Sequence, residues 1–120
     1  MWFNLRILKK SFNYAVKGVR YAFKNEQNFR IQLVITSGVV ILMFILKVRA
    51  WEAVALIFVI VAVLVLELVN TIFERFIDIL KPRLLDQAKI IKDMMAAAVF
   101  LAAFGALVVG LIIFYPYFIE

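Results

Sequence analysis

The chain has 120 residues, of which 67% are hydrophobic and 18% charged, and its net charge is +6. Soluble domains are about 45–50% apolar and about 25% charged, and a chain this small cannot hide so much apolar surface from water. The composition therefore predicts a single membrane-embedded domain, 1–120. The sequence contains no cysteine and no histidine, which excludes disulfides, cysteine-zinc sites and histidine-dependent nucleophile triads.

Residues 1–29 form the most basic part of the chain, and Glu26 is their only acid. At helical spacing the basic side chains share one narrow sector, and apolar side chains fill the adjacent one. These two sets are Arg6, Lys9, Lys17, Arg20 and Lys24, and Leu5, Leu8, Phe12, Val19 and Phe23. The pattern predicts an amphipathic surface helix with lipid headgroups, not nucleic acid, as its partner. The segment is too polar for a cleavable signal peptide.

Three apolar runs follow, at about 31–48, 51–80 and 89–118, and they are interpreted as membrane spans. The first is short for a span, but its flanks and snorkelling side chains can extend it. The second run ends in a polar helical segment that Pro82 should terminate. The expected fold is an all-α membrane protein with one surface helix and three transmembrane helices. Lys and Arg gather in the N-terminal segment and in the loop of residues 75–92. The positive-inside rule therefore places the N-terminus in the cytoplasm and the C-terminus outside.

The third run carries four small residues at successive i+4 steps, Ala98, Ala102, Ala106 and Gly110. Such a stripe lets another helix approach closely. Packing within the chain and contact between subunits both account for it. Three thin helices enclose a polar site poorly, so we expect a homo-oligomer.

The second run ends in a polar stripe, because Glu67, Asn70, Glu74 and Asp78 stand at i, i+3, i+7 and i+11. A carboxylate at membrane depth costs about 2.5 kcal/mol or more unless it faces protein or water. Glu67 lies deepest and has no basic residue within one turn. Glu74 or Asp78 alone could equally be the solvated end of a helix, but the set favours a functional site.

Further polar residues should reach the same face of the membrane: Glu26 on the surface helix, and Lys92 and Asp93 at the entrance of the third span. Hard oxygen ligands suit Mg²⁺, a lysine suits phosphates, and a spare carboxylate can serve as a base. This inventory indicates Mg²⁺ bound to a polyphosphate. Since the sequence lacks the glycine-rich motif of a P-loop, any nucleotide must be held by side chains and metal.

Three runs of the sequence resemble the small bacterial diacylglycerol kinase family, and they cover essentially the whole chain in order and spacing. They are Tyr14-x-x-Lys17-Gly18-x-Arg20-x-Ala22-x-x-Asn25-Glu26-x-x-Phe29-Arg30, Glu67-Leu68-Val69-Asn70-Thr71-x-x-Glu74-x-x-x-Asp78 and Ala88-x-x-x-Lys92-Asp93-Met94-x-Ala96-Ala97.

The resemblance implies a homotrimeric lipid kinase of the bacterial cytoplasmic membrane that uses ATP and Mg²⁺, faces the cytoplasm and shares active sites between subunits. It implies Glu67 as the general base, and Glu26 and Glu74 as holders of Mg²⁺ and the phosphates. The remaining roles also follow from the resemblance alone. Tyr14, Lys92 and Asp93 would contact the nucleotide, and Asn25, Asn70 and Asp78 would support the site.

The acceptor stays open, because the family has a diacylglycerol branch and an undecaprenol branch. The ending Ile112-Ile113-Phe114-Tyr115-Pro116 looks like the polyprenol branch, whereas Asp93-Met94 looks like the diacylglycerol branch. Gln32 stands where the polyprenol branch tends to have histidine, and Ala96 stands where the other branch has serine.

The alternative from another class is a non-enzymatic scaffold or transporter subunit. A proton-coupled transporter would place its acid near the bilayer midplane, whereas Glu67 lies toward the cytoplasmic end of its span.

Overall fold

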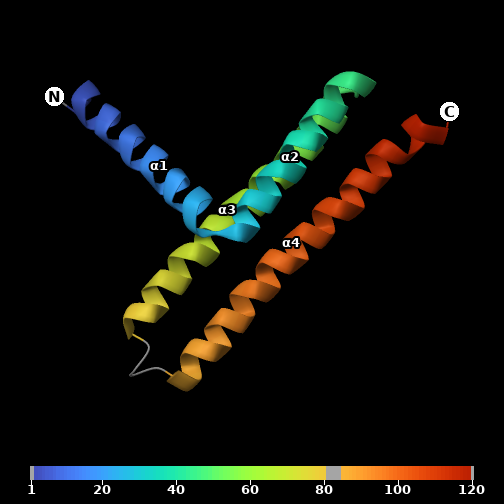
Figure 1. The fold of residues 1–120 in the computed structure, drawn as a ribbon. Coiled ribbons are helices and arrows are strands. Elements are labelled where there is room, and N and C mark those ends of the chain that lie inside the picture. Colours follow the sequence, from blue (N-terminus) through green and yellow to red (C-terminus); the bar gives the residue numbers. More distant parts are fainter. Residues whose placement is uncertain (1, 81–84, 120) are drawn as a thin grey trace.

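The computed structural model describes residues 2–80 and 85–119, and it folds them into four α-helices (Figure 1). These are α1 (Leu5–Asn25), α2 (Gln27–Leu46), α3 (Ala50–Leu80) and α4 (Leu85–Ile119). α3 packs against both α2 and α4. α1 leaves the other three helices at a steep angle and carries the N-terminus away from them (Figure 1).

Helix α1 begins at a side-chain cap, because the Asn4 carboxamide oxygen accepts hydrogen bonds from the backbone N–H groups of Arg6 (2.9 Å) and Ile7 (3.4 Å). Ala22 is its buried residue, and its other side chains are exposed, basic and apolar ones alike. α1 is therefore held to the rest of the chain mainly near its C-terminal end.

The elbow between α1 and α2 is the extended residue Glu26, with φ −119° and ψ 109°. Its N–H donates to the Ala22 carbonyl (2.8 Å), and its own carbonyl accepts from the N–H of Arg30 (3.2 Å). The Arg30 guanidinium reaches back to the carbonyls of Phe23 (2.7 Å) and Lys24 (3.1 Å). It thereby satisfies acceptors that the end of a helix leaves without partners.

The elbow lies a few residues before the predicted boundary between the surface helix and the first span, which was placed at about residues 29–31. The surface helix ends at Asn25 and not near residue 29, and α2 begins at Gln27 and not near residue 31. Phe29 is buried in the first turn of α2. The hydrophobic pattern did not mark this break, because the break depends on Arg30 capping the helix before it.

A three-residue link, residues 47–49, joins α2 to α3. Lys47 adopts a left-handed conformation (φ 52°, ψ 54°), and its N–H donates to the Met43 carbonyl. At the start of α3 the Glu52 carboxylate accepts the backbone N–H of Arg49 (2.9 Å), as in a capping box. The Tyr117 hydroxyl, near the end of α4, donates to the same carboxylate. We call this contact the Glu52–Tyr117 staple.

Three of the four helices in the described ranges are long and apolar enough to cross a membrane: Gln27–Leu46, Ala50–Leu80 and Asp86–Ile119. This confirms an all-α protein with three candidate spans. Few large side chains are buried, whereas Phe44 and Phe58 are 79% and 76% exposed. Such surfaces suit lipid or a neighbouring subunit and not water. The helix end expected at Pro82 lies outside the described residues, and α4 begins at Leu85, before the expected residue 89.

The stripe of small residues on α4 is half-buried within the single chain at all four positions, Ala98, Ala102, Ala106 and Gly110. α4 packs on α3, and bulky neighbours of the stripe such as Leu101 and Phe104 are exposed. Packing within the chain therefore accounts for part of the stripe, whereas a Cβ atom added at Gly110 would meet nothing within 4 Å, so contact with another subunit stays a prediction there.

Candidate active site

The polar stripe of α3 begins at Glu67, which is only 3% exposed. One turn later the Thr71 hydroxyl donates to the Glu67 carbonyl (3.1 Å). Asn70 lies on the same side of the helix, and its side-chain amide donates to Glu74 Oε1 at 3.4 Å. The predicted helical spacing thus places the Asn70 amide against the Glu74 carboxylate, about one turn from the buried carboxylate of Glu67.

The elbow brings a third carboxylate to this stripe. Glu26, whose side chain is 16% exposed, lies near enough for its charge to act on both Glu67 and Glu74. Asp78 acts on Glu74 in the same way. We call Glu26, Glu67, Glu74 and Asp78 the acidic cluster. Glu67, Glu74 and Asp78 come from α3. Glu26 comes from the elbow between α1 and α2, which the local sequence pattern did not predict.

Two cations border the acidic cluster. One Arg75 nitrogen lies 4.0 Å from Glu26 Oε2 and 4.0 Å from Asp78 Oδ2, and another donates to the Tyr21 hydroxyl at 3.5 Å. The Lys92 ammonium, from α4, lies 3.1 Å from Asp78 Oδ1. Arg75 is half-exposed at the side chain, so these cations are placed to meet an anion that approaches the cluster from solvent.

Glu67 lines a cleft of about 290 Å³. Its polar wall is Asn28, Gln32 and Asn70, and its apolar wall, from α4, is Ala96, Val99, Phe100 and Ala103. Among the residues that the structure describes, no hydrogen bond or ion pair engages the Glu67 carboxylate. No buried side-chain oxygen of the described residues lacks a partner, so the Glu67 carboxylate is reached from the cleft. Such a carboxylate suits a ligand that joins a hydroxyl to a hydrocarbon, because the hydroxyl can donate to it while the hydrocarbon meets the apolar wall.

The cluster does not form a closed metal site, since no three acidic side chains in the described ranges come together in the way that a metal cage requires. Mg²⁺ in enzymes that handle nucleotides is usually held by one or two carboxylates together with substrate phosphates. Glu26 and Glu74, whose charges act on one another across the elbow, supply a pair of this kind. The chemistry of these donors therefore fits Mg²⁺ that arrives with a polyphosphate.

Three predicted site residues do not contact the acidic cluster in the described part of this chain. Tyr14 is 66% exposed on α1, with the Lys17 ammonium 6.0 Å from the centre of its ring. Asn25 donates to the Tyr21 carbonyl (2.9 Å) and so caps its own helix. Asp93 forms an exposed ion pair with Lys89 (2.9 Å). Roles for these three in a nucleotide site stay predictions.

Sequence reasoning missed Arg75 and Tyr21 as neighbours of the site, and it singled out Gln32 only as a position at which the two branches of the family differ. Arg75 had a usable signal, because it stands three residues before Asp78 and pairs at i,i+3 are neighbours on a helix. Tyr21 had no such signal, since only the elbow brings α1 against α3.

Comparison with known proteins agrees with this geometry. Residues 13–114 match the family described as prokaryotic diacylglycerol kinase. A diacylglycerol kinase of Synechocystis sp. is 39% identical over 101 residues, which is 83% of this chain, although the chain spans only 58% of that relative's length. An undecaprenol kinase of Bacillus subtilis is 31% identical over 107 residues, which is 89% of this chain and 87% of the relative. The family match covers the acidic cluster, the elbow, the first two candidate spans and most of the third, and the chain therefore belongs to the prokaryotic diacylglycerol kinase family.

Proposed function

We propose that the chain is a membrane lipid kinase that transfers the γ-phosphate of ATP to the hydroxyl of a lipid alcohol. The observation that carries this proposal is Glu67, a buried carboxylate without a protein partner in a cleft with one polar and one apolar wall. The names of the two relatives support the acceptor class, because diacylglycerol and undecaprenol are both lipid alcohols.

Glu67 acts as the general base in this proposal. The acceptor hydroxyl donates its proton to the carboxylate as the hydroxyl oxygen attacks the γ-phosphorus, and ADP leaves. Four small or apolar side chains of α4 form the far wall of the cleft. They favour an acceptor that carries a hydrocarbon over water, which is the competing acceptor.

Glu26 and Glu74 hold Mg²⁺, which when bound neutralises charge on the β- and γ-phosphates. The Asn70 amide fixes the rotamer of Glu74 through their hydrogen bond. Lys92 contacts the phosphates, while Asp93 and Tyr14 contact the nucleotide. Lys92 stands beside Asp78, so its ammonium is already directed toward the cluster.

We place the protein in the bacterial cytoplasmic membrane as a homotrimer, with α1 in the interface, the N-terminus and the acidic cluster on the cytoplasmic side, and the C-terminus outside. The steep departure of α1 (Figure 1) and its exposed basic and apolar side chains support an interfacial helix. Phe76 and Ile79, beside the cluster, are 57% and 76% exposed. Such apolar surface at the polar end of α3 supports a neighbouring subunit.

The test is phosphate transfer from labelled ATP and Mg²⁺ to diacylglycerol and to undecaprenol in parallel mixed micelles. Glu67→Gln should lower turnover by about 10²- to 10⁴-fold, because it removes the base, while ATP binding is retained. Asp86→Asn is the matched control, since it neutralises an exposed acid in the first turn of α4 and should leave turnover unchanged.

Full activity of Glu67→Gln would remove Glu67 from the mechanism. A folded protein that transfers phosphate to neither lipid would remove the kinase proposal and leave the scaffold alternative.

A further inference from the structure

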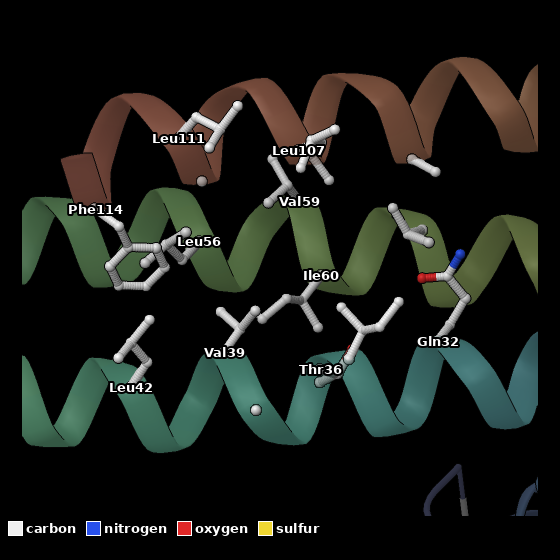
Figure 2. Close-up of a pocket in the computed structure, with 16 residues that line it drawn as sticks. Gln32, Thr36, Val39, Leu42, Leu56, Val59, Ile60, Leu107, Leu111 and Phe114 are labelled. Atoms are coloured by element: carbon white, nitrogen blue, oxygen red, sulfur yellow. The ribbon is translucent and has the colours of Figure 1, made fainter.

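An apolar groove of about 560 Å³ runs along the chain between α2 and α4, with α3 as its floor (Figure 2). Leu56, Ile60 and Val63 come from the floor. Figure 2 shows Val39 and Leu107 projecting toward α3 from the two flanking helices. The volume lies in the range of about 300–1,000 Å³ that is usual for ligand sites, so the groove can hold an extended apolar ligand.

The groove is continuous with the Glu67 cleft, because Gln32 and Ala103 line both. Gln32 stands at one end of the groove in Figure 2, and it lines the same cleft as Glu67. Leu42 follows Gln32 by ten residues on α2, which is about 15 Å along a helix axis, or half of a hydrocarbon layer about 30 Å thick. Cleft and groove together thus lead from a carboxylate into the depth of the membrane.

From this continuity we infer that the groove receives the hydrocarbon chain of the acceptor, and that the acceptor is a single-chain lipid alcohol with its hydroxyl in the Glu67 cleft. The inference rests on the proposed kinase function and specifies its substrate class. Two apolar grooves that the described residues form beside α1 share no lining residue with the cleft. A second acyl chain, as in diacylglycerol, would therefore find no matching place along either of them.

Small residues keep the groove open. A Cβ atom added at Gly38 or Gly110 would meet nothing within 4 Å, and Ala106 adds little bulk beside them. A chain that enters the groove leaves equally apolar lipid, so the hydrophobic effect does not drive it in. The groove acts instead by alignment, because a held chain presents its hydroxyl to Glu67 in a productive orientation.

Filling the groove tests the inference, and the chain offers a matched pair of glycines on α4. Gly110→Leu places a side chain in the groove, while Gly105→Leu makes the same change at an exposed position outside it. Both sites have open space, and leucine favours helix over glycine at each, so both variants should fold. We expect Gly110→Leu to lower kcat/KM for undecaprenol by at least about tenfold and to leave the KM for ATP unchanged.

Two further comparisons sharpen this expectation. Geraniol, whose chain is too short to reach Gly110 from the cleft, should be phosphorylated equally well by the wild type and by Gly110→Leu. The wild type should prefer undecaprenol to dioleoylglycerol. Gly105→Leu should match the wild type with every acceptor.

The inference is overturned if Gly110→Leu and Gly105→Leu behave alike with undecaprenol, or if dioleoylglycerol is the better acceptor. It is also overturned if Gly110→Leu, and not Gly105→Leu, changes the oligomer mass in light scattering. The groove would then be filled by a second copy of the chain.

A photoreactive long-chain alcohol separates this inference from the kinase proposal, because its readout needs no turnover. With the reactive group near the chain end, it should label α2 and α4 around Gly38 and Gly110 in the wild type, and much less in Gly110→Leu. Such labelling without phosphate transfer would reject the kinase proposal alone. Transfer to geraniol by the wild type without any groove labelling would reject the groove inference alone.

Discussion

At the scale of single residues, the carboxylates of the acidic cluster have two different proposed roles. Glu67 is the proposed base, whereas Glu26 and Glu74 are the proposed metal ligands. Glu67 makes no polar contact in the described part of the chain beyond its own backbone, as a base that awaits a hydroxyl requires. Glu26 and Glu74 repel one another, and a divalent cation between them would relieve that repulsion. Loss of a proposed metal ligand should therefore change the Mg²⁺ concentration that turnover requires, whereas loss of Glu67 should lower turnover itself.

Glu74→Gln and Glu26→Gln should each raise the Mg²⁺ concentration for half-maximal turnover by at least about tenfold, because each removes one proposed ligand charge. The measurement is phosphate transfer at fixed ATP over a series of Mg²⁺ concentrations. Asp86→Asn serves as the charge-matched control. A Mg²⁺ curve that coincides with the wild type in either variant would remove that residue from the proposed metal site.

A second residue-scale prediction concerns the Glu52–Tyr117 staple at the opposite end of α3. Glu52 is buried and accepts from both Tyr117 and the Arg49 backbone. Tyr117→Phe leaves this carboxylate one partner short and should lower the free energy of unfolding by about 1–3 kcal/mol. Thermal unfolding in detergent measures this effect, while activity per folded molecule should stay unchanged.

Tyr115→Phe is the control, because Tyr115 is exposed two residues away on the same helix and its hydroxyl should matter by less than about 0.5 kcal/mol. Equal stability of the two variants would show that the staple does not hold α4 to α3.

At the scale of the elements, the elbow decides whether Glu26 reaches α3 at all. Glu26 is pinned by its own N–H and carbonyl, and the Arg30 side chain ties the last carbonyls of α1 to the first turn of α2. Arg30 touches no member of the acidic cluster with its side chain in the described structure. It is therefore a positioning residue that acts through Glu26.

Arg30→Gln should raise the Mg²⁺ requirement in the same direction as Glu26→Gln, and Arg30→Lys should restore part of the loss, because lysine can donate to one of the two carbonyls. Mn²⁺ binding in the presence of ATP, followed by electron paramagnetic resonance, reports the same change without turnover. Arg20→Gln, which removes an exposed charge from the neighbouring helix α1, controls for the lost charge. Weak activity with unchanged Mn²⁺ binding would assign Arg30 a structural role only.

The elements also show which features local sequence can predict. The stripe from Glu67 to Asp78 was predictable, because its members stand on one continuous helix and its period is fixed by helix geometry. The elbow was not, since it depends on Arg30 donating to a carbonyl seven residues earlier. The Glu52–Tyr117 contact joins residues 65 apart, and no periodicity links them. The Glu67 cleft needs walls from α2 and α4, which only packing supplies.

At the scale of the whole molecule, one chain brings Glu26, Glu67 and Glu74 together but leaves Tyr14 apart. If a trimer forms, we expect these three carboxylates to act within one subunit and the exposed Tyr14 to reach the nucleotide site of a neighbour. The resemblance to trimeric kinases with shared sites implied such sharing without saying which residues cross between subunits.

Mixed oligomers test this division. Glu26→Gln and Glu67→Gln, refolded together, should not restore activity, because no subunit then carries an intact set of carboxylates. Tyr14→Ala mixed with Glu67→Gln should recover part of the activity, since an intact cluster can meet an intact Tyr14 from the neighbour. Complementation by the first pair would show that Glu26 serves the site of a different subunit.

The basic side chains of α1 would affect the local concentrations of Mg²⁺ and of its nucleotide complex near the site. An anionic leaflet near −30 mV enriches a divalent cation about tenfold at its surface and depletes a doubly charged Mg–nucleotide complex by about the same factor. If α1 lies against the headgroups as proposed, its exposed basic side chains would oppose that potential; they are Arg6, Lys9, Lys17, Arg20 and Lys24. The anionic lipid would thus raise the concentration of the divalent cation at the surface, while the basic side chains of α1 would reduce the repulsion of the nucleotide complex. The apparent affinity for the nucleotide would then depend on the charge of the surrounding lipid.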